Sequence, residues 1–172
     1  MDAGAIRRAI KRLAHQIIED HPSLEHLALV GIPNRGVELS RRLQQEIEAE
    51  EGVRVHLGVI DVSMHRDDIT LRRQLSTIQA SSLPFELEDC EIILVDDVFF
   101  TGRTCRAALD AITSFGRPPR IRFAALIDRG YPELPIAPQY TGKKLHTTKN
   151  DHVEVRFENV DNEPDAAWLK KL

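Results

Sequence analysis

The sequence predicts an α/β fold, in which an open, mainly parallel twisted sheet is flanked by helices within one domain over residues 1–172. Three observations predict it. Short apolar runs alternate with segments of helical periodicity, which is the pattern of a parallel sheet covered on both faces. A chain of 172 residues suits one domain of ordinary size. No repeat, linker or low-complexity tract divides it.

The first part of the chain predicts two helices and two strands. An amphipathic helix is expected near residues 3–20, because apolar side chains recur there at helical spacing: Ile6, Ile10, Leu13 and Ile17. The apolar run 27–32 reads as a buried strand bounded by Gly31 and Pro33. A second helix follows, with an apolar row of Leu39, Leu43 and Ile47. Alternation over residues 53–59 predicts the next strand.

Periodicity fails between His65 and Pro84. This stretch is polar and has few apolar anchors; its charged residues include Arg66, Asp67, Asp68, Arg72 and Arg73. A long irregular segment inside a compact domain is usually either functional or disordered. Two roles for the arginines are equally consistent with the sequence: they could contact a substrate, or they could simply keep the loop soluble.

The second part of the chain predicts the strongest strand. Residues 92–95 are fully apolar and run straight into Asp96 and Asp97. A helix follows that ends at Gly116, with Cys105, Ala108, Leu109 and Ile112 on its core face. Strands are then expected over residues 121–127 and 153–157. From Asn162 onward we expect a frayed tail, anchored by Trp168.

Composition narrows the function classes. The net charge of −4 argues against a generally polyanion-binding surface, and no apolar run is long enough to cross a bilayer. The first residues lack a secretion signal, so a cytoplasmic location is expected. Cys90 and Cys105 have neither a CxxC partner nor a nearby His pair. Buried thiols are therefore favoured over a disulfide or a zinc site.

Three polar or Gly-containing loops follow the core strands, at residues 31–36, 96–104 and 128–130. Ligands of open parallel sheets bind beyond the carboxyl ends of the strands, so these loops are the predicted ligand site. No Walker motif is present, because Val37 and Glu38 follow Gly36, and there is no Gly-x-Gly-x-x-Gly fingerprint.

The loop at residues 95–104 suits a ribose 5-phosphate. Backbone N–H groups at a helix start, with the hydroxyls of Thr101 and Thr104, form a cradle for phosphate, and Gly102 lets the chain approach closely. The acids Asp96 and Asp97 can accept hydrogen bonds from vicinal hydroxyls. The alternative is a plain strand end followed by a Thr helix cap. It is weakened because two acids at the end of an apolar strand carry a desolvation cost.

These residues resemble the ribose-phosphate motif of type I phosphoribosyltransferases. The closer resemblance is to the bifunctional pyrimidine-operon attenuation regulators with uracil phosphoribosyltransferase activity. It covers nearly the whole chain and is carried by residues 5–9, Ala14-His15, Val30-Gly31-Ile32, Arg35-Gly36, Arg66-Asp67-Asp68, residues 93–104, Asp128-Arg129-Gly130, residues 133–136 and Gly142-Lys143.

The resemblance implies a role for each loop. Asp96 and Asp97 would hold the ribose hydroxyls of 5-phosphoribosyl-1-pyrophosphate (PRPP), and residues 101–104 would hold its 5-phosphate. Within residues 101–104 this includes Arg103, and the remaining PRPP-binding residues would be Asn34, Arg35, Gly36 and Val98. Arg35 would face pyrophosphate, against the alternative of a solvated loop arginine. Ile127, Asp128 and Arg129 would border the base.

The resemblance also implies the chemistry. Asp128 would help to position Mg²⁺ or its waters, and Arg35, Asp97 and Asp128 would form the catalytic set. Residues 65–84 would be a flexible hood that excludes water. Uracil and PRPP would give UMP and pyrophosphate, and the chain would form a homodimer or a higher homo-oligomer. A transferase for another base stays open.

A basic stripe on the first helix offers a second function. Arg8, Lys11, Arg12 and His15 repeat opposite the apolar row. Such a stripe is usually a solvated face, but in the resembling family this helix contributes to binding messenger RNA, and Lys143 would add to it. The alternative function is thus an RNA-binding attenuator that senses uridine nucleotides and catalyses little.

Overall fold

The computed structural model describes residues 1–65 and 80–171. Five strands form one sheet in the order β2-β1-β3-β4-β5, and every neighbouring pair is parallel. The predicted open parallel sheet is confirmed. Its strands are β1 (Leu27–Gly31), β2 (His56–Val59), β3 (Glu91–Phe99), β4 (Ile121–Asp128) and β5 (Tyr140–Lys144).

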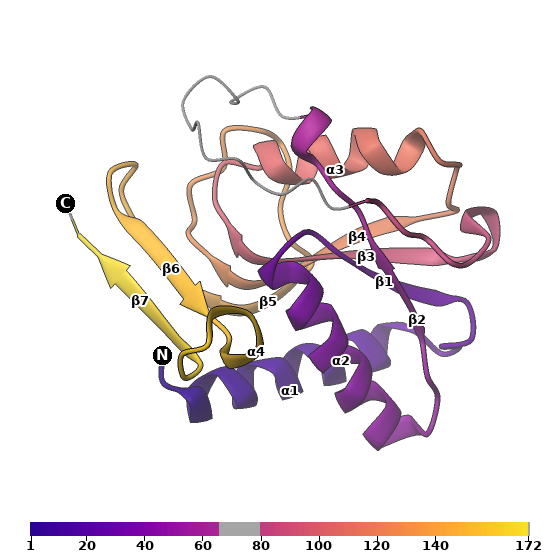
Figure 1. Cartoon of the computed structure of the whole chain (residues 1–172), viewed down its shortest axis with the longest axis horizontal. Helices are drawn as coiled ribbons and strands as arrows, with labels where there is room; N and C mark the ends of the chain where they lie inside the picture. The colour runs from indigo at the N-terminus through magenta and orange to yellow at the C-terminus, as the bar shows by residue number, and fades with distance from the viewer. Residues whose placement is uncertain (66–79, 172) are drawn as a thin grey trace.

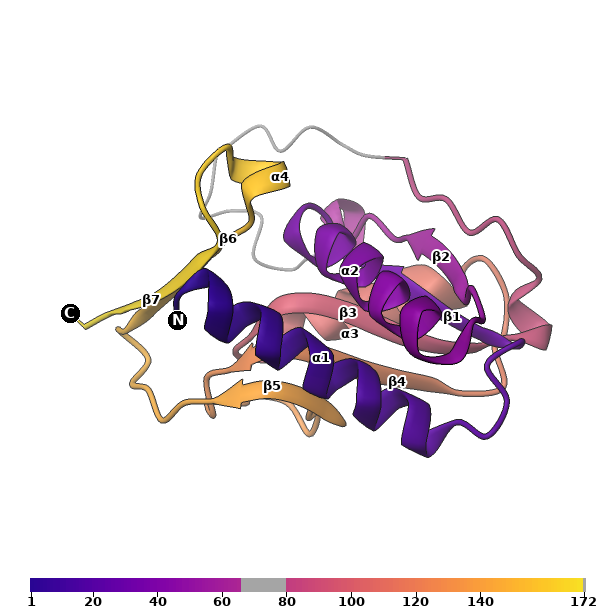
Figure 2. The same cartoon turned by 90° about the horizontal axis from the view of Figure 1, so that it is seen from below.

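Helices cover both faces of this sheet. α1 (Ala3–Asp20) and α2 (Arg35–Glu51) lie on one face and α3 (Arg103–Thr113) lies on the other (Figures 1 and 2). Two clusters of buried apolar residues correspond to the two faces. One joins α1 and α2 to alternate residues of the strands, and the other joins α3 to the residues between them. A strand alternates its side chains between faces, so both faces must be apolar here.

The predicted helix bounds agree closely with the structure. α1 starts after Asp2, whose carboxylate accepts a hydrogen bond from the Ala5 amide at 2.7 Å. Such a cap satisfies one of the amides that a helix start leaves without an intrahelical partner. α2 ends at Gly52 in the left-handed conformation, with φ of 67°. The predicted apolar faces of both helices are buried.

The strand predictions need two corrections. β2 begins at His56 and not at residue 53, although Val55 is buried. β3 continues four residues past Val95, because its ladder with β4 extends to the pair Phe99 and Asp128. Asp96 and Asp97 therefore lie inside a strand, whereas the sequence suggested that the strand ends at them. β5 was not predicted, since its sequence lacks an alternating apolar pattern.

The C-terminal segment is ordered. β6 (His152–Arg156) confirms the predicted late strand, and it pairs antiparallel with β7 (Ala166–Lys170). The expectation of a frayed tail is thus wrong. The short helix α4 (Glu158–Asp161) connects these strands, and Met1 exchanges two backbone hydrogen bonds with Ala167. Trp168 is 43% exposed, so it is not a buried anchor.

The described ends of the predicted hood lie against the sheet edge. Val59 and Ser82 form an isolated antiparallel bridge, with hydrogen bonds of 2.8 and 2.9 Å. Ser63–His65 and Leu87–Asp89 are single 3-10 turns, η1 and η3. Arg66, Asp67, Asp68, Arg72 and Arg73, the charged residues of the hood prediction, lie outside the described residues.

Candidate functional site

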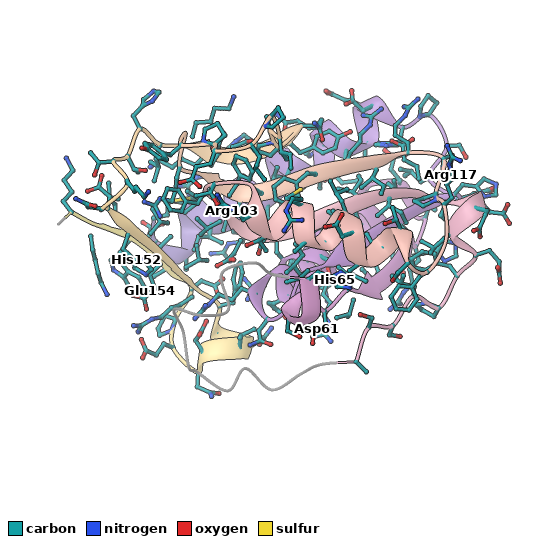
Figure 3. All side chains as sticks on the ribbon, turned by 90° about the horizontal axis from the view of Figure 1, so that it is seen from above. Asp61, His65, Arg103, Arg117, His152 and Glu154 are labelled. Carbon is teal, nitrogen blue, oxygen red and sulfur yellow. The ribbon has the colours of Figure 1, made fainter. Side chains whose placement is uncertain are left out.

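The three predicted loops meet at the carboxyl edge of the sheet. The Ile32 amide donates to the Val95 carbonyl at 3.0 Å, and the Arg129 amide donates to the Phe99 carbonyl at 3.0 Å. In Figure 3, Arg103 at the start of α3 lies toward β6, where Glu154 is labelled, while Arg117 lies at the far end. The structure thus brings the start of α2, the end of β3, the start of α3 and the end of β4 together.

Two glycines allow the first loop to approach β3. A Cβ on Gly36 would lie 2.4 Å from the Val95 carbonyl oxygen and 3.2 Å from the Asp96 Cα. A Cβ on Gly31 would lie 2.5 Å from the Val37 Cα. Neither glycine can be replaced by a larger residue without a shift of the backbone. Gly36 therefore sets the spacing between the start of α2 and the acids of β3.

The two acids point to different sides of β3. Successive residues of a strand face opposite sides. Asp96 is buried and its charge acts on the Cys105 thiol of α3, whereas Asp97 is half-buried and lies in the field of Arg35 on α2. The Asp97 amide donates to Asp96 Oδ1 at 2.9 Å. Both acids lie inside β3 and face opposite sides of it, so they do not form two parallel carboxylates.

Burial has the largest effect on the pKa values of Asp97 and of the Cys105 thiol. It raises the pKa of the Asp97 carboxyl above its usual value, although hydrogen bonding with Asp96 and the positive charge of Arg35 act in the opposite sense. The pKa of the Cys105 thiol is raised to about 12, first by burial and then by the charge of Asp96. Cys105 is thus a packed thiol, as predicted, and not a nucleophile.

The start of α3 has the form of an anion cradle. Gly102 precedes the helix with φ of 89°, a left-handed conformation that favours glycine. The first intrahelical bond runs from the Arg106 amide to the Gly102 carbonyl at 2.9 Å. Thr101 Oγ1 accepts only a long bond, 3.4 Å, from the Arg103 amide. Amides of a helix start attract anions through the helix dipole, and the half-buried hydroxyls of Thr101 and Thr104 lie beside them.

The loop after β4 closes over this cradle on one side. The Glu133 amide donates to the Thr101 carbonyl at 2.9 Å, and Arg103 Nε donates to Glu133 Oε2 at 3.0 Å. A Cβ on Gly102 would be 3.5 Å from the Leu134 Cβ, an ordinary contact. Arg103 is thus held by Glu133 in this structure. Its predicted contact with PRPP stays a prediction.

Residues at the end of β4 are occupied with structural contacts. Arg129 is 5% exposed; its guanidinium donates to Thr147 Oγ1, Thr148 O and Asp151 O, and it stacks 3.6 Å above the Phe100 ring. Burial lowers the pKa of Arg129. Ile127 is buried in the core. The described contacts of both residues hold the fold, and their predicted contact with the base stays a prediction.

Asn34 and Arg35 begin α2 at the same edge. Asn34 is exposed and makes no side-chain cap to the helix. Arg35 Nε and Nη2 donate to the two carboxylate oxygens of Asp161, at 3.1 and 2.7 Å. This hydrogen bonding, above the opposing effect of burial, raises the pKa of Arg35. Asp97 and Glu154 add smaller attractions.

Sequence reasoning missed Asp161 and Glu154. Asp161 is on α4, and Glu154 is on β6, which packs against β3. No motif or spacing pointed to either residue, since both lie more than a hundred positions after Arg35. The signal that was available is the alternation over residues 153–157, which predicted the strand but not its place in the fold.

The donor set at this edge suits a hard cation brought by a substrate. Mg²⁺ is usually held by one or two carboxylates together with substrate phosphates and water. Asp128 Oδ1 accepts the Gly130 amide at 2.8 Å, and this turn makes no hydrogen bond to the other carboxylate oxygen, Oδ2. Within residues 1–65 and 80–171, no group of three His, Cys, Asp or Glu side chains is placed to hold a metal. Asp128 therefore fits a shared site and not a closed protein cage.

The basic stripe of α1 lies apart from this site and divides in two. Lys11 and His15 lean toward α2, where Glu46 and Glu50 lie 3.8 Å away. Arg12 turns the other way and donates to the Gly142 carbonyl at 3.0 Å, beside Lys143 on β5. Arg8 is exposed. Ion pairs this exposed contribute little energy, so they do not prevent the basic side chains from binding another partner. The neighbouring glutamates nevertheless neutralise part of the positive charge of the stripe.

A cleft of about 740 Å³ lies between α1, α2 and residues 158–165. None of the residues predicted to bind PRPP lines it. Its walls mix both charges, with Arg7, Arg41 and Arg42 beside Glu38, Glu46 and Asp165. The size of a cleft alone does not make a site, and the convergent amides and acids at the sheet edge favour that edge.

None of the helices in the described part of the chain is long and apolar enough to cross a membrane.

Comparison with solved structures supports the fold. A hypoxanthine phosphoribosyltransferase from Staphylococcus aureus aligns with a TM-score of 0.65 at 20% identity, covering 88% of this chain and 77% of the other. A glutamine mutant from a study of an invariant aspartic acid in HPRTs aligns with a TM-score of 0.74 at 18% identity, covering 99% and 92%. At such identities the likeness shows the type I phosphoribosyltransferase fold.

Sequence comparison shows the family. Residues 2–160 match the family model described as phosphoribosyl transferase domain. The bifunctional protein PyrR of Caldicellulosiruptor saccharolyticus is 45% identical over 163 residues, covering 95% of this chain and 90% of the relative. That of Listeria monocytogenes serotype 4b (strain CLIP80459) is 44% identical over 174 residues, covering 99% and 95%. The chain belongs to the type I phosphoribosyltransferases and, among them, to the family of the bifunctional PyrR proteins that its motifs resemble.

Proposed function

We propose that this protein transfers the phosphoribosyl group of PRPP to uracil, giving UMP and pyrophosphate. The observation that carries the proposal is the meeting of Asp97, the Thr101–Thr104 turn and Arg35 at one edge of a phosphoribosyltransferase fold. The relatives named PyrR support uracil as the base. The base is thus the part of the proposal that depends on resemblance.

The residues suit three parts of one substrate. The amides at the start of α3 and the Thr101 hydroxyl would bind the 5-phosphate, and Asp96 and Asp97 would accept hydrogen bonds from the ribose hydroxyls. Arg35 would bind the pyrophosphate group. An arginine suits that task because its planar donors match phosphate oxygens in pairs.

Transfer needs no nucleophile from the protein. The bond from uracil N1 to the anomeric carbon forms as the bond from that carbon to pyrophosphate breaks, and the proton of N1 passes to water. Mg²⁺ bound with PRPP, next to Asp128, would stabilise the charge on the departing pyrophosphate. Arg35 would act on the same charge, while the carboxylates of Asp96 and Asp97 would lie near the sugar on which positive charge develops. Positioning and electrostatics would supply most of the rate.

Pyrophosphate release, measured separately with uracil, adenine, guanine, hypoxanthine and orotate in the presence of Mg²⁺, tests this proposal. Turnover with uracil alone is expected. Turnover with a purine in place of uracil would move the protein to another substrate class. Absence of turnover with all five bases would reject the enzymatic proposal.

A second proposed function is regulation of pyrimidine genes through RNA, because the relatives are named bifunctional and α1 exposes Arg8, Lys11, Arg12 and His15. UMP would change the affinity for RNA. Binding of pyrimidine-operon leader RNA is measured with and without UMP at two salt concentrations. Arg8→Ala should reduce both the affinity for RNA and its salt dependence, because a protein that makes one phosphate contact fewer releases fewer counterions on binding. Affinity unaffected by UMP would contradict this second function.

A further inference from the structure

Asp161 grips one edge of the Arg35 guanidinium. The contact is bidentate, from Nε and Nη2 to the two carboxylate oxygens. A guanidinium has five N–H donors in a rigid plane, and this contact uses two of them. The edge formed by Nη1 and the second Nη2 proton stays free of Asp161. A phosphate can therefore bind Arg35 in the same bidentate way without displacing Asp161.

Asp161 is itself held in place. Its Oδ2 also accepts the Phe157 amide at 2.9 Å, and the Val160 and Asp161 amides donate to the Phe157 carbonyl. Phe157 is fully buried in the core on the α1 and α2 face of the sheet. The carboxylate is thus attached to the core through a single tight turn. It is a fixed support and not a mobile surface acid.

Polar contacts dock the rest of this segment on α2. Arg42 pairs with Asp165, at 3.1 Å for Nη2 and Oδ1, and Asn159 Nδ2 donates to Glu38 Oε1 at 2.8 Å. α4 has no buried residue, and the cleft of about 740 Å³ lies beside it. Arg35 and Arg42 stand two turns apart on one helix, and each has its own aspartate. Only the first pair is close to the acids of β3.

We propose that Asp161 is a positioning residue for pyrophosphate binding: it fixes the Arg35 guanidinium with its free edge toward the pyrophosphate group of PRPP. This inference rests on the proposed function. A free arginine side chain loses rotamer freedom on binding, and a side chain that is already ordered loses less. Removal of the support should therefore weaken pyrophosphate binding by roughly three- to tenfold, the usual cost of immobilising one such side chain.

The test uses calorimetric binding of two probes, pyrophosphate with Mg²⁺ and ribose 5-phosphate. Asp161→Asn keeps the shape and one acceptor for the Phe157 amide but removes the charge that holds Arg35. We expect weaker binding of pyrophosphate and unchanged binding of ribose 5-phosphate. Asp165→Asn is the matched control, because it breaks the Arg42 pair and leaves Arg35 alone. Asp165→Asn should bind both probes as the wild type does, and its melting temperature should fall by about as much as that of Asp161→Asn.

A double variant connects the effect to Arg35. Asp161→Asn should cost nothing further in an Arg35→Gln background. If Arg35→Gln weakens pyrophosphate binding but Asp161→Asn binds as tightly as the wild type, or more tightly, the inference is wrong and the proposed function stands. Equal losses in Asp161→Asn and Asp165→Asn would also overturn it. If the wild type binds neither probe, the proposed function fails as well.

Discussion

Substitution of Gly36 by alanine tests the geometry of the site most directly. The new methyl would be 2.4 Å from the Val95 carbonyl oxygen, and ordinary van der Waals contact begins at 3.4 Å. The start of α2 must therefore retreat from β3 by about 1 Å. Both neighbours are backbone, so no flexible side chain can move aside. Arg35 adjoins Gly36 and moves with it, away from Asp97.

The expected result is a large loss of activity in a folded protein. A misplacement of about 1 Å in a reacting assembly can cost on the order of a hundredfold in rate. We expect kcat/KM for PRPP to fall by roughly that factor, measured as pyrophosphate release with uracil. Circular dichroism should show native secondary structure, since α2 keeps its apolar face of Leu39, Leu43 and Ile47.

Gly52→Ala is the matched control. Gly52 ends α2 with φ of 67°, and a Cβ at this position would have no atom within 4 Å, so alanine there meets backbone strain but no collision. Its cost should be about 1 kcal/mol of stability, the usual penalty at a left-handed helix end. Activity should be unchanged. A Gly36→Ala protein that folds and keeps wild-type kcat/KM would refute the reasoning, because the loop would then not need its observed spacing.

Four further results are expected. Asp97→Asn should weaken PRPP binding by roughly tenfold or more, the loss of a charged hydrogen bond, and should raise the melting temperature at pH 7, because burial raises the pKa of Asp97 and its ionisation opposes folding; a lower melting temperature contradicts this. Thr101→Ala should weaken ribose 5-phosphate binding about fivefold, whereas unchanged affinity would remove the hydroxyl from the cradle. Cys105, with a pKa of about 12, should resist Ellman's reagent at pH 8 until urea unfolds the protein, and rapid labelling of the native protein would be incompatible with its burial. Burial raises the pKa of Tyr140 to about 12, so the neutral phenol should contribute stability that is present below pH 10 and lost between pH 10 and 12. The free energy of unfolding, followed by fluorescence, should fall less steeply with pH over this range in Tyr140→Phe than in the wild type, and equal slopes would exclude that contribution.

Local pattern is sufficient to predict four of the five strands of the sheet and its three main helices. Buried strands such as Leu27–Gly31 are short apolar runs between turn residues, and helices such as Ala3–Asp20 have an apolar row on one face. Each of these signals is local, because the residues that form it are close together in the sequence. The turn at residues 101–104, which we propose as the anion cradle, is recognisable for the same reason, since a Gly and two hydroxyls next to a helix start form one continuous segment.

Features that depend on distant partners could not be predicted. The sequence predicts a frayed tail in place of β7, because Trp168 and Leu169 are followed by charges and the strand has no polar alternation of its own. Its order comes from pairing with β6 and from the backbone bonds between Met1 and Ala167. β3 likewise extends past Val95 because β4 continues beside it. Tertiary pairing here overrides the local sequence signal.

The placement of Asp96 and Asp97 inside β3 changes what the acids can do. Past the end of a strand, carboxylates are better solvated and ionise at a smaller cost than inside it. Inside the strand they lie on opposite sides, and burial raises the pKa of Asp97, so the ionised carboxylate destabilises the free protein. A ribose hydroxyl that donates a hydrogen bond to the Asp97 carboxylate would offset part of this cost. Ligand binding and stability are then coupled, which is why Asp97→Asn should weaken PRPP binding and stabilise the free protein together.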